Sequence, residues 1–279
     1  MKDTTEDVVL SNLGNSFMDD FHDYQSIKDL WRYQHRCRID VIDSCLSRYC
    51  KKSIVGLDAG SGKGPSTVIM SRYLKEIHSI EYEQSNVDRQ KINFKNSNLV
   101  KGSKISIKQG DLTNVELKSE LADMIVCSEV LEHIDDYESA AAELYRVSKP
   151  GGTVIFSMPN GLSAFWLYDR VNYFLVKFVR YLKRKPMDTT GYSYWERSRH
   201  WAFSSKDIRK IISKPGFNIV EERGVSALVC NEWIYSHLVW GKFFMFIHKV
   251  ETFLGKKIPR ICGIYFLVLV KPNNPEDAK

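Results

Sequence analysis

A glycine-rich loop follows the first apolar run of this 279-residue chain, in the stretch VGLDAGSGKGPST from Val55 to Thr67. Glycine lets the backbone run close beneath a bound ligand, and loop N–H groups can bind the anionic part of that ligand. We expect the N–H groups of Gly60 and Gly62 to be free for this purpose. The spacing of the glycines then decides which ligand the loop can hold.

Two common nucleotide loops do not fit this spacing. A triphosphate loop needs Gly, four residues, and then Gly-Lys before Ser or Thr, but Leu57 and Gly64 stand at its first and last positions. A dinucleotide loop, G-x-G-x-x-G, would place its third glycine at Pro65. A plain strand-to-helix turn would need fewer glycines. The pattern that remains is D-x-G-x-G-x-G, which begins at Asp58.

Further polar residues end the next strand candidates in order. Glu81 and Tyr82 follow the second strand, where an acid can accept hydrogen bonds from ribose hydroxyls. Asp111-Leu112 follows the third strand, in KQGDL. The stretch ADMIVCSEVLEHIDD then supplies a fourth strand and a polar loop. Since the carboxyl ends of parallel strands meet at one edge of a sheet, these residues should lie around one ligand.

The loop and these strand ends together resemble the class I S-adenosylmethionine-dependent methyltransferases. The resemblance runs from about Ile54 to Phe217 and is to the group that includes the ubiquinone- and menaquinone-pathway enzymes. It implies S-adenosylmethionine as cofactor, with Asp111 at the adenine amino group. Ser79 departs from the family pattern, because a glycine is common there. The implied cofactor-binding residues are Asp58, Ala59, Gly60, Ser61, Gly62, Gly64, Glu81, Tyr82, Asp111, Leu112, Cys127, Ser128 and Glu129.

The order of the predicted elements indicates an α/β fold. Short β-branched runs alternate with helical stretches, as in sheets of parallel strands covered on both faces. We therefore expect a doubly wound, mostly parallel seven-stranded sheet of the Rossmann-like methyltransferase type. Predicted strands are SIVGLD, EIHSIE, KISIKQ, DMIVCS, TVIFSM, GFNIVEERG and IYFLVLV, and predicted helices include PSTVIMSRYLKE, YESAAAELYRVSK and SSKDIRKIIS.

Three regions divide the chain. Residues 1–50 are predicted to form a helical N-terminal cap that packs over one end of the sheet. Residues 51–279 form the methyltransferase domain, and residues 161–199 within it form a helical insertion after the fifth strand. A further helical region is expected between Asn231 and Leu254.

The overall composition is that of an ordinary globular protein, with 43% hydrophobic and 27% charged residues. No secretion signal and no uncharged apolar run of membrane-spanning length is present, and the six cysteines show no metal-binding spacing. We expect a cytoplasmic protein with reduced thiols. The net charge of +6 permits contact with an anionic surface but does not by itself argue for nucleic acid, and no nucleic-acid partner is expected.

Two histidines are candidate catalytic residues. Methyl transfer from a sulfonium needs alignment of donor and acceptor, and a base only where the acceptor must lose a proton. His133 in LEHI has the better position, because its loop should border the methyl group, and His200 in RHW is the other candidate. His133 could instead only brace its loop. Glu129, Glu132 and His133 could also bind a divalent metal, and the sequence leaves this open.

The insertion carries bulky apolar side chains together with bases. In FWLYDRVNYFLVKFVRYLKRK, Arg170, Lys177 and Arg184 are spaced seven apart, beside Arg180, Lys183 and Lys185. This pattern is typical of a helix that lies on an anionic membrane surface, here the inner face of the membrane. A pocket lid and a dimer contact are the alternatives. The acceptor is expected to be a small molecule or a lipid-like compound, with O-methylation favoured.

Two other functions compete with a methyltransferase. A nicotinamide-dependent oxidoreductase would use a similar fold, and a non-catalytic S-adenosylmethionine-binding scaffold would use the same loop. The glycine spacing argues against the first, and only turnover excludes the second. Acceptor and oligomeric state stay open at this level.

Overall fold

The computed structural model describes residues 30–50, 55–96, 100, 102–183, 203–227 and 244–277. The strands are β1 (Val55–Ala59), β2 (Glu76–Glu81), β3 (Lys104–Gln109), β4 (Ala122–Ser128), β5 (Ser148–Pro159), β6 (Asn218–Val225) and β7 (Ile264–Val270). The α-helices are α2 (Leu30–Tyr49), α3 (Pro65–Met70), α4 (Gln84–Asn96), α5 (Tyr137–Val147), α6 (Ala164–Leu182), α8 (Ser205–Ser213) and α10 (Phe244–Lys257). Short 3-10 turns are η3 (Leu131–His133), η5 (Pro259–Ile261) and η6 (Pro275–Asp277).

The strands form one seven-stranded sheet in the order β3-β2-β1-β4-β5-β7-β6. Strands β1 to β5 pair in parallel, whereas β7 runs antiparallel to both β5 and β6. The predicted doubly wound, mostly parallel sheet is therefore confirmed. Because β1 to β6 all point the same way, their carboxyl ends meet at one edge, which is where ligands bind in sheets of this kind.

Alternate residues of the central strands pack into two separate apolar layers, as the pleat requires. On β4, Ile125 packs into the layer that includes α5 and α8. Its neighbours Met124 and Val126 pack into the opposite layer, together with Ile42 of α2 and Ile69 of α3. Both faces of the sheet are thus covered. This explains why its strands read as continuous apolar runs in the sequence.

The N-terminal helix lies in a different place from the one predicted. Helix α2 does not pack over an end of the sheet: its residues Ile39, Ile42 and Leu46 are buried on a face, against α3 and the sheet. The physical reason is the apolar stripe of α2, which a sheet face can bury and an open end cannot. Residues 1–29 of the predicted cap lie outside the described residues.

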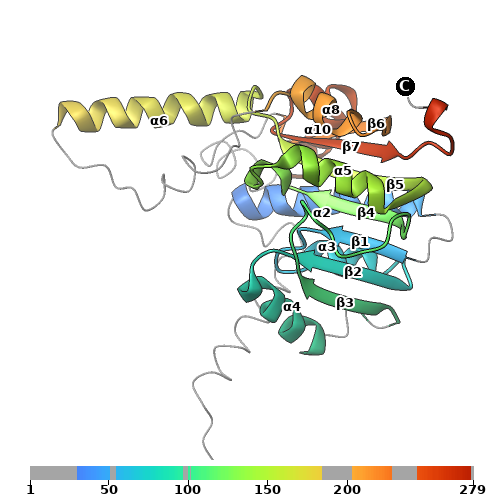
Figure 1. Ribbon diagram of the computed structural model, residues 1–279. Coiled ribbons are helices and arrows are strands. Elements are labelled where there is room, and N and C mark those ends of the chain that lie inside the picture. Colours follow the sequence, from blue (N-terminus) through green and yellow to red (C-terminus); the bar gives the residue numbers. More distant parts are fainter. Residues whose placement is uncertain are drawn as a thin grey trace, which may run out of the picture.

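Helix α6 leaves the carboxyl edge of the sheet and extends away from the body of the molecule (Figure 1). Ser163 caps it, because its side chain accepts a hydrogen bond from the Trp166 N–H. The helix confirms the predicted helical character of the insertion over its own span. Residues 184–199 of the insertion lie outside the described residues. Within the part of the chain that the structure describes, no helix has the length and hydropathy needed to cross a bilayer.

Candidate functional site

The glycine loop adopts a backbone that few other residues could follow. Gly60, Gly62 and Gly64 have φ angles of 74°, 55° and 95°, and positive φ is costly for any residue with a side chain. A β-carbon at Gly62 would meet no atom within 4 Å, so the loop is open to ligand there. A β-carbon at Gly64 would instead lie 2.6 Å from the Phe94 ring.

A buried hydrogen-bond network holds the loop in this shape. Ser79 Oγ donates to Ser61 Oγ at 2.7 Å, and the Gln90 side-chain amide donates both to Ser61 Oγ at 2.6 Å and to the Gly62 carbonyl at 2.7 Å. Ser79 is the residue that departs from the family pattern, and here it supports the loop. Gln90 lies on α4, and sequence reasoning missed it because nothing local marks a residue whose partner is 28 positions away.

The expectation that the loop N–H groups are free is wrong. The Gly60 N–H donates to the Ile80 carbonyl at 2.9 Å, and the Gly62 N–H donates to Glu81 Oε2 at 2.8 Å. The Ser61 N–H also donates to the Ile80 carbonyl. The loop folds back against the end of β2, and its donors are used there. A negative charge on a ligand cannot rely on the N–H groups of Gly60, Ser61 and Gly62.

Asp58 supports the loop from inside the protein. It is 2% exposed, and its carboxylate accepts a hydrogen bond from Thr67 Oγ1 at 2.5 Å. Burial raises the pKa of Asp58 to about 7, although the bond from Thr67 opposes the shift. Its side chain therefore joins β1 to α3. Thr67 is a further residue that the sequence did not single out.

Glu81 is buried at the end of β2 and is hydrogen-bonded to the glycine loop at Gly62. Besides the bond from Gly62, its Oε1 accepts a hydrogen bond from the Glu83 N–H at 3.0 Å. Oε1 also accepts a longer bond from the Asn86 side-chain amide at 3.5 Å, whereas Oε2 keeps a second lone pair that could accept a bond from a hydroxyl. Tyr82 is beside it and is 71% exposed. This geometry fits the predicted role of Glu81, which stays a prediction.

At the end of β3 the two predicted residues differ in exposure. Asp111 is exposed, and its Oδ1 accepts hydrogen bonds from the Thr113 N–H and hydroxyl, both at 2.8 Å. Leu112 is buried in the apolar layer that includes α5. Asp111 can thus reach a ligand with its other oxygen, and Leu112 offers backbone.

Two of the predicted cofactor residues have side chains that point away from the edge. Cys127 and Ala59 are fully buried in the apolar layer that includes α5. Burial raises the pKa of the Cys127 thiol well above its usual range, so it stays protonated. With its thiol buried, Cys127 could line the cofactor only through its backbone, and its place in the cofactor site stays a prediction. Successive side chains of a strand point to opposite faces of the sheet, and the sequence alone does not show which of two neighbouring residues points toward a ligand.

The residues after Cys127 do lie at the edge. Ser128 Oγ and Ser157 Oγ are 2.8 Å apart, and Ser157 Oγ donates to Glu129 Oε1 at 3.1 Å. Glu129 has a φ of 59°, which for a residue with a side chain indicates a locally constrained backbone. Burial raises the pKa of the Glu129 carboxyl, and the charge of Arg38 opposes that shift. These bonds join the ends of β4 and β5.

Glu132 is a second buried carboxyl on the same loop. It is 1% exposed, and neither of its oxygens has a hydrogen-bond partner among the described residues. Burial, followed by the nearby charge of Glu129, raises the pKa of Glu132 well above its usual range. An unpaired buried carboxylate is costly, so this group is held neutral.

His133 follows on the 3-10 turn η3, and its side chain is 40% exposed. Its Nε2 lies 3.8 Å from Glu132 Oε1. That distance is within range of an ion pair, but burial lowers the pKa of His133 while it raises that of Glu132. We therefore describe this contact as one between two neutral groups. A neutral imidazole with partial exposure is suited to accept a proton.

Helix α2 brings two bases to this site that sequence reasoning did not identify. The Arg38 guanidinium donates to His35 Nδ1 at 2.7 Å. Burial and the charges of Arg38 and Lys63 lower the pKa of His35 to about 3. Lys63 belongs to the glycine loop, and its charge acts on His35 of α2, while the charge of Arg38 on α2 acts on Glu129. Only the packing of α2 on the sheet reveals this.

The possible metal ligands do not form a metal centre. Across the described residues, no group of three or more His, Cys, Asp and Glu side chains is arranged to hold a metal ion. This includes Glu129, Glu132 and His133. His200, the other catalytic candidate, lies outside the described residues.

Comparisons with known proteins address the identity of this site. The family model described as "Methyltransferase domain" matches residues 57–156, which span the glycine loop, Glu81, Asp111 and His133. A protein of Mycolicibacterium smegmatis named "Probable S-adenosylmethionine-dependent methyltransferase/" is 25% identical over 126 residues. That alignment covers 45% of this chain and 46% of the relative, so the chain spans about half the length of this relative.

Two further similarities extend over more of the chain. A ubiquinone biosynthesis O-methyltransferase of Rickettsia typhi is 26% identical over 206 residues, which cover 74% of this chain and 77% of that protein. The solved structure of the cyclase SpnF has a TM-score of 0.57 and 16% identity, and covers 86% of this chain and 83% of that chain. At this identity, the last match shows the fold alone. The predicted fold class is confirmed. Residues 57–156 match the predicted methyltransferase domain, and the similarity to S-adenosylmethionine-dependent methyltransferases supports the predicted enzyme class and cofactor.

Proposed function

We propose that this chain, which carries a class I S-adenosylmethionine-dependent methyltransferase domain, transfers the methyl group to a hydroxyl of a small-molecule or lipid-like acceptor. The observation that carries this proposal is His133, a partly exposed histidine beside the carboxyl edge with a lowered pKa. A neutral histidine can take the proton that a hydroxyl must lose. The names of the Rickettsia relatives, which are O-methyltransferases of ubiquinone biosynthesis, favour the same acceptor class.

The residues at the edge fit the cofactor by shape and by donor set. Gly62 leaves open space above the loop, and Glu81 can accept hydrogen bonds from ribose hydroxyls. Asp111 retains an oxygen for the adenine amino group. Because the loop N–H groups are used within the protein, we assign the methionine carboxylate to Arg38 and Lys63, the bases that border this space.

The chemistry of the cofactor lies in its sulfonium, which makes the attached methyl group ready for in-line displacement. His133 would accept the acceptor's proton at its imidazole as the hydroxyl oxygen forms the new bond. The resulting imidazolium would lie close to Glu132, whose ionised form is then favoured by the new positive charge.

Helix α6 carries the surface that we assign to collecting the methyl acceptor. Its exposed apolar residues include Phe174, Leu175 and Phe178, and exposed bases are Lys177 and, at the C-cap, Lys183. We assign this surface to reversible contact with the anionic inner face of a membrane, from which a cytoplasmic enzyme could collect a lipid-like acceptor. A pocket lid and a dimer contact are the competing roles of the insertion, whose span of residues 161–199 we retain within a catalytic domain of residues 51–279.

The test is formation of S-adenosylhomocysteine from S-adenosylmethionine in the presence of an alkyl-substituted phenol. The matched control is the methyl ether of the same phenol, which has no proton to lose and should give no product. Binding of S-adenosylhomocysteine without turnover on any phenol or on soluble amines would instead support a non-catalytic scaffold. The fold alone does not decide, because its neighbours include a cyclase.

A further inference from the structure

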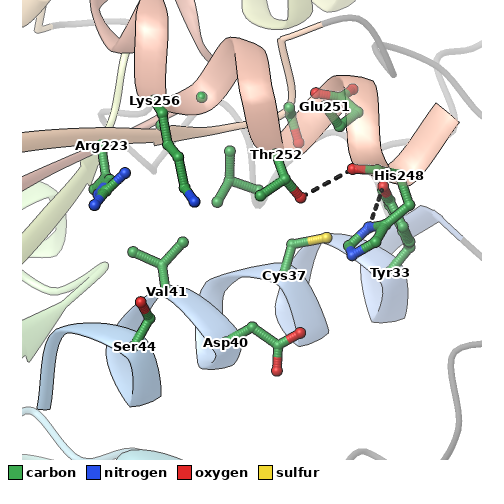
Figure 2. A pocket seen from close by; sticks show the side chains of 14 residues that line it. Tyr33, Cys37, Asp40, Val41, Ser44, Arg223, His248, Glu251, Thr252 and Lys256 are labelled. Carbon is green, nitrogen blue, oxygen red and sulfur yellow. Dashed lines mark hydrogen bonds between the residues drawn. The ribbon is translucent and has the colours of Figure 1, made fainter. Parts of the chain in front are cut away.

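A groove separate from the cofactor site lies between helices α2 and α10, over the end of strand β6 (Figure 2). Its volume is about 230 Å³. Cys37 and Val41 of α2 form one wall, Thr252 and Gly255 of α10 form the other, and Val225 of β6 lies at its base. Nothing in the proposed methyl transfer uses this space.

The polar groups at the inner end of the groove already have partners. Tyr33 Oη lies 3.2 Å from His248 Nδ1, and Thr252 Oγ1 donates to the His248 carbonyl at 2.9 Å (Figure 2). Glu251 is 5% exposed and accepts a hydrogen bond from the Ala227 N–H at 2.8 Å. Since these polar groups already have hydrogen-bond partners within the protein, we expect a ligand to make van der Waals contacts rather than new hydrogen bonds at the inner end.

The other end of the groove carries excess positive charge. Arg223 and Lys256 lie together at this end (Figure 2). The Glu221 carboxylate binds both Arg223 and Arg48, so that cluster has one more base than acid. Lys256 is exposed and has no ion-pair partner among the described residues.

The acids that line the groove do not cancel this charge. Asp40 is paired with Arg36 at 3.2 Å, one turn earlier on α2. Glu251 is at the buried end and is held by the backbone of Ala227. An anionic group between Arg223 and Lys256 would therefore meet two bases and no free carboxylate among the lining residues.

We infer that this groove binds a small organic anion with an apolar body. The anionic group lies between Arg223 and Lys256, and the apolar body extends along Val41 and Val225 toward Tyr33. The groove is distinct from the methyl-acceptor site. The groove shares no lining residue with the glycine loop, with Glu81 or with the loop that carries Glu129 and His133.

Isothermal titration calorimetry with sodium decanoate, below its micelle concentration, tests the inference on the full chain. We expect saturable binding with one site per chain. Lys256→Glu should weaken it about tenfold or more, because an attraction becomes a repulsion. The matched control is Lys257→Glu, the same change at an adjacent exposed lysine that does not line the groove. It should change the affinity by no more than about twofold.

Two further arms separate this site from general apolar adsorption. Val41→Trp should fill the groove and abolish saturable binding, while the melting temperature reports whether the variant is folded. Decylamine has the same chain with a positive charge, and should not compete. Equal weakening in the two lysine variants, binding that persists in Lys256→Glu, or equal binding of decylamine would overturn the inference. None of these readouts depends on methyl transfer.

Discussion

The glycine loop and helix α6 both lie at the carboxyl edge of the sheet, but they differ in which side chains they bury and which they expose. Behind the loop, the buried polar side chains of Ser79 on β2 and Gln90 on α4 are hydrogen-bonded to one another and to Ser61. On α6, large apolar side chains such as Phe174 and Phe178 are 57% and 59% exposed. The polar groups near the loop find their hydrogen-bond partners within the protein, whereas α6 exposes apolar side chains to water, which is unfavourable.

This difference has a physical consequence. A binding site for a defined small molecule needs its groups fixed before the ligand arrives, and a satisfied network does that. A surface that meets a membrane needs exposed apolar area and bases, and it gains nothing from internal partners. We therefore expect substitutions at the site to change affinity and rate sharply. Substitutions on α6 should change only where the protein is found.

The largest effect is expected from replacing His133, the proposed general base on η3. His133→Ala should lower turnover on a phenolic acceptor by about 100-fold, because general-base catalysis contributes this much, and should leave S-adenosylhomocysteine affinity nearly unchanged. Steady-state kinetics and calorimetry measure the two quantities. His78→Ala, at a histidine of β2 away from this loop, is the control.

The pH profile sharpens the same prediction. Burial lowers the pKa of His133, so the neutral base persists to more acidic pH than in free histidine. The rate should rise with pH, and the midpoint of the acid limb should lie below 6.5, the ordinary value for histidine. Equal rates for wild type and His133→Ala would reduce His133 to a brace for its loop.

The next effect concerns affinity at the end of β2. Glu81→Ala should weaken S-adenosylhomocysteine binding by about 1–3 kcal/mol, since it removes a charged acceptor and leaves buried donors unpaired. Calorimetry measures this, and Glu83→Ala is the control, because that exposed neighbour contributes its backbone N–H rather than its side chain. Undiminished affinity in a folded Glu81→Ala variant would remove Glu81 from the site.

On α6, the expected effect is on membrane association alone. Wild-type protein should sediment with anionic vesicles at low salt and be released at higher salt. The double variant Lys177→Glu, Lys183→Glu should lose about 2 kcal/mol of vesicle affinity, at about 1 kcal/mol for each base. Lys91→Glu on α4 is the control, and S-adenosylhomocysteine affinity should stay constant in both. If the wild-type protein stays in the supernatant at low salt, α6 is a lid or a dimer contact.

The smallest expected effect distinguishes two glycines within the loop. Gly64→Ala should lower the free energy of unfolding by about 1–2 kcal/mol more than Gly62→Ala. Both positions have positive φ, but only a β-carbon at Gly64 would meet the Phe94 ring. Gly62→Ala should instead act on cofactor affinity, because its β-carbon enters the open space. Denaturant unfolding and calorimetry separate the two. Equal losses of stability would contradict the geometry.

The sequence by itself was enough to predict all seven strands of the described sheet and their order along the chain, although it did not single out α4 and it extended α3 beyond Met70. Ser204 with Asp207 predicts the start of α8, and the structure has that capping box. The glycine spacing predicts a loop whose backbone can run close beneath a ligand, and in the structure Gly60, Gly62 and Gly64 have positive φ. These features depend on local sequence, on caps, turns and apolar periods, so a short stretch is sufficient to define them.

Only the tertiary structure decided how the site is completed. The Gly62 N–H bonds to Glu81, and the charge of Arg38 acts on Glu129, so segments far apart in the chain meet here. Packing also decides that the side chain of Cys127 is buried. The groove between α2 and α10 is another such feature, because its walls are separated by about two hundred residues. Periodicity shows that a face is buried, but the partner of that face is selected by packing the whole chain at once.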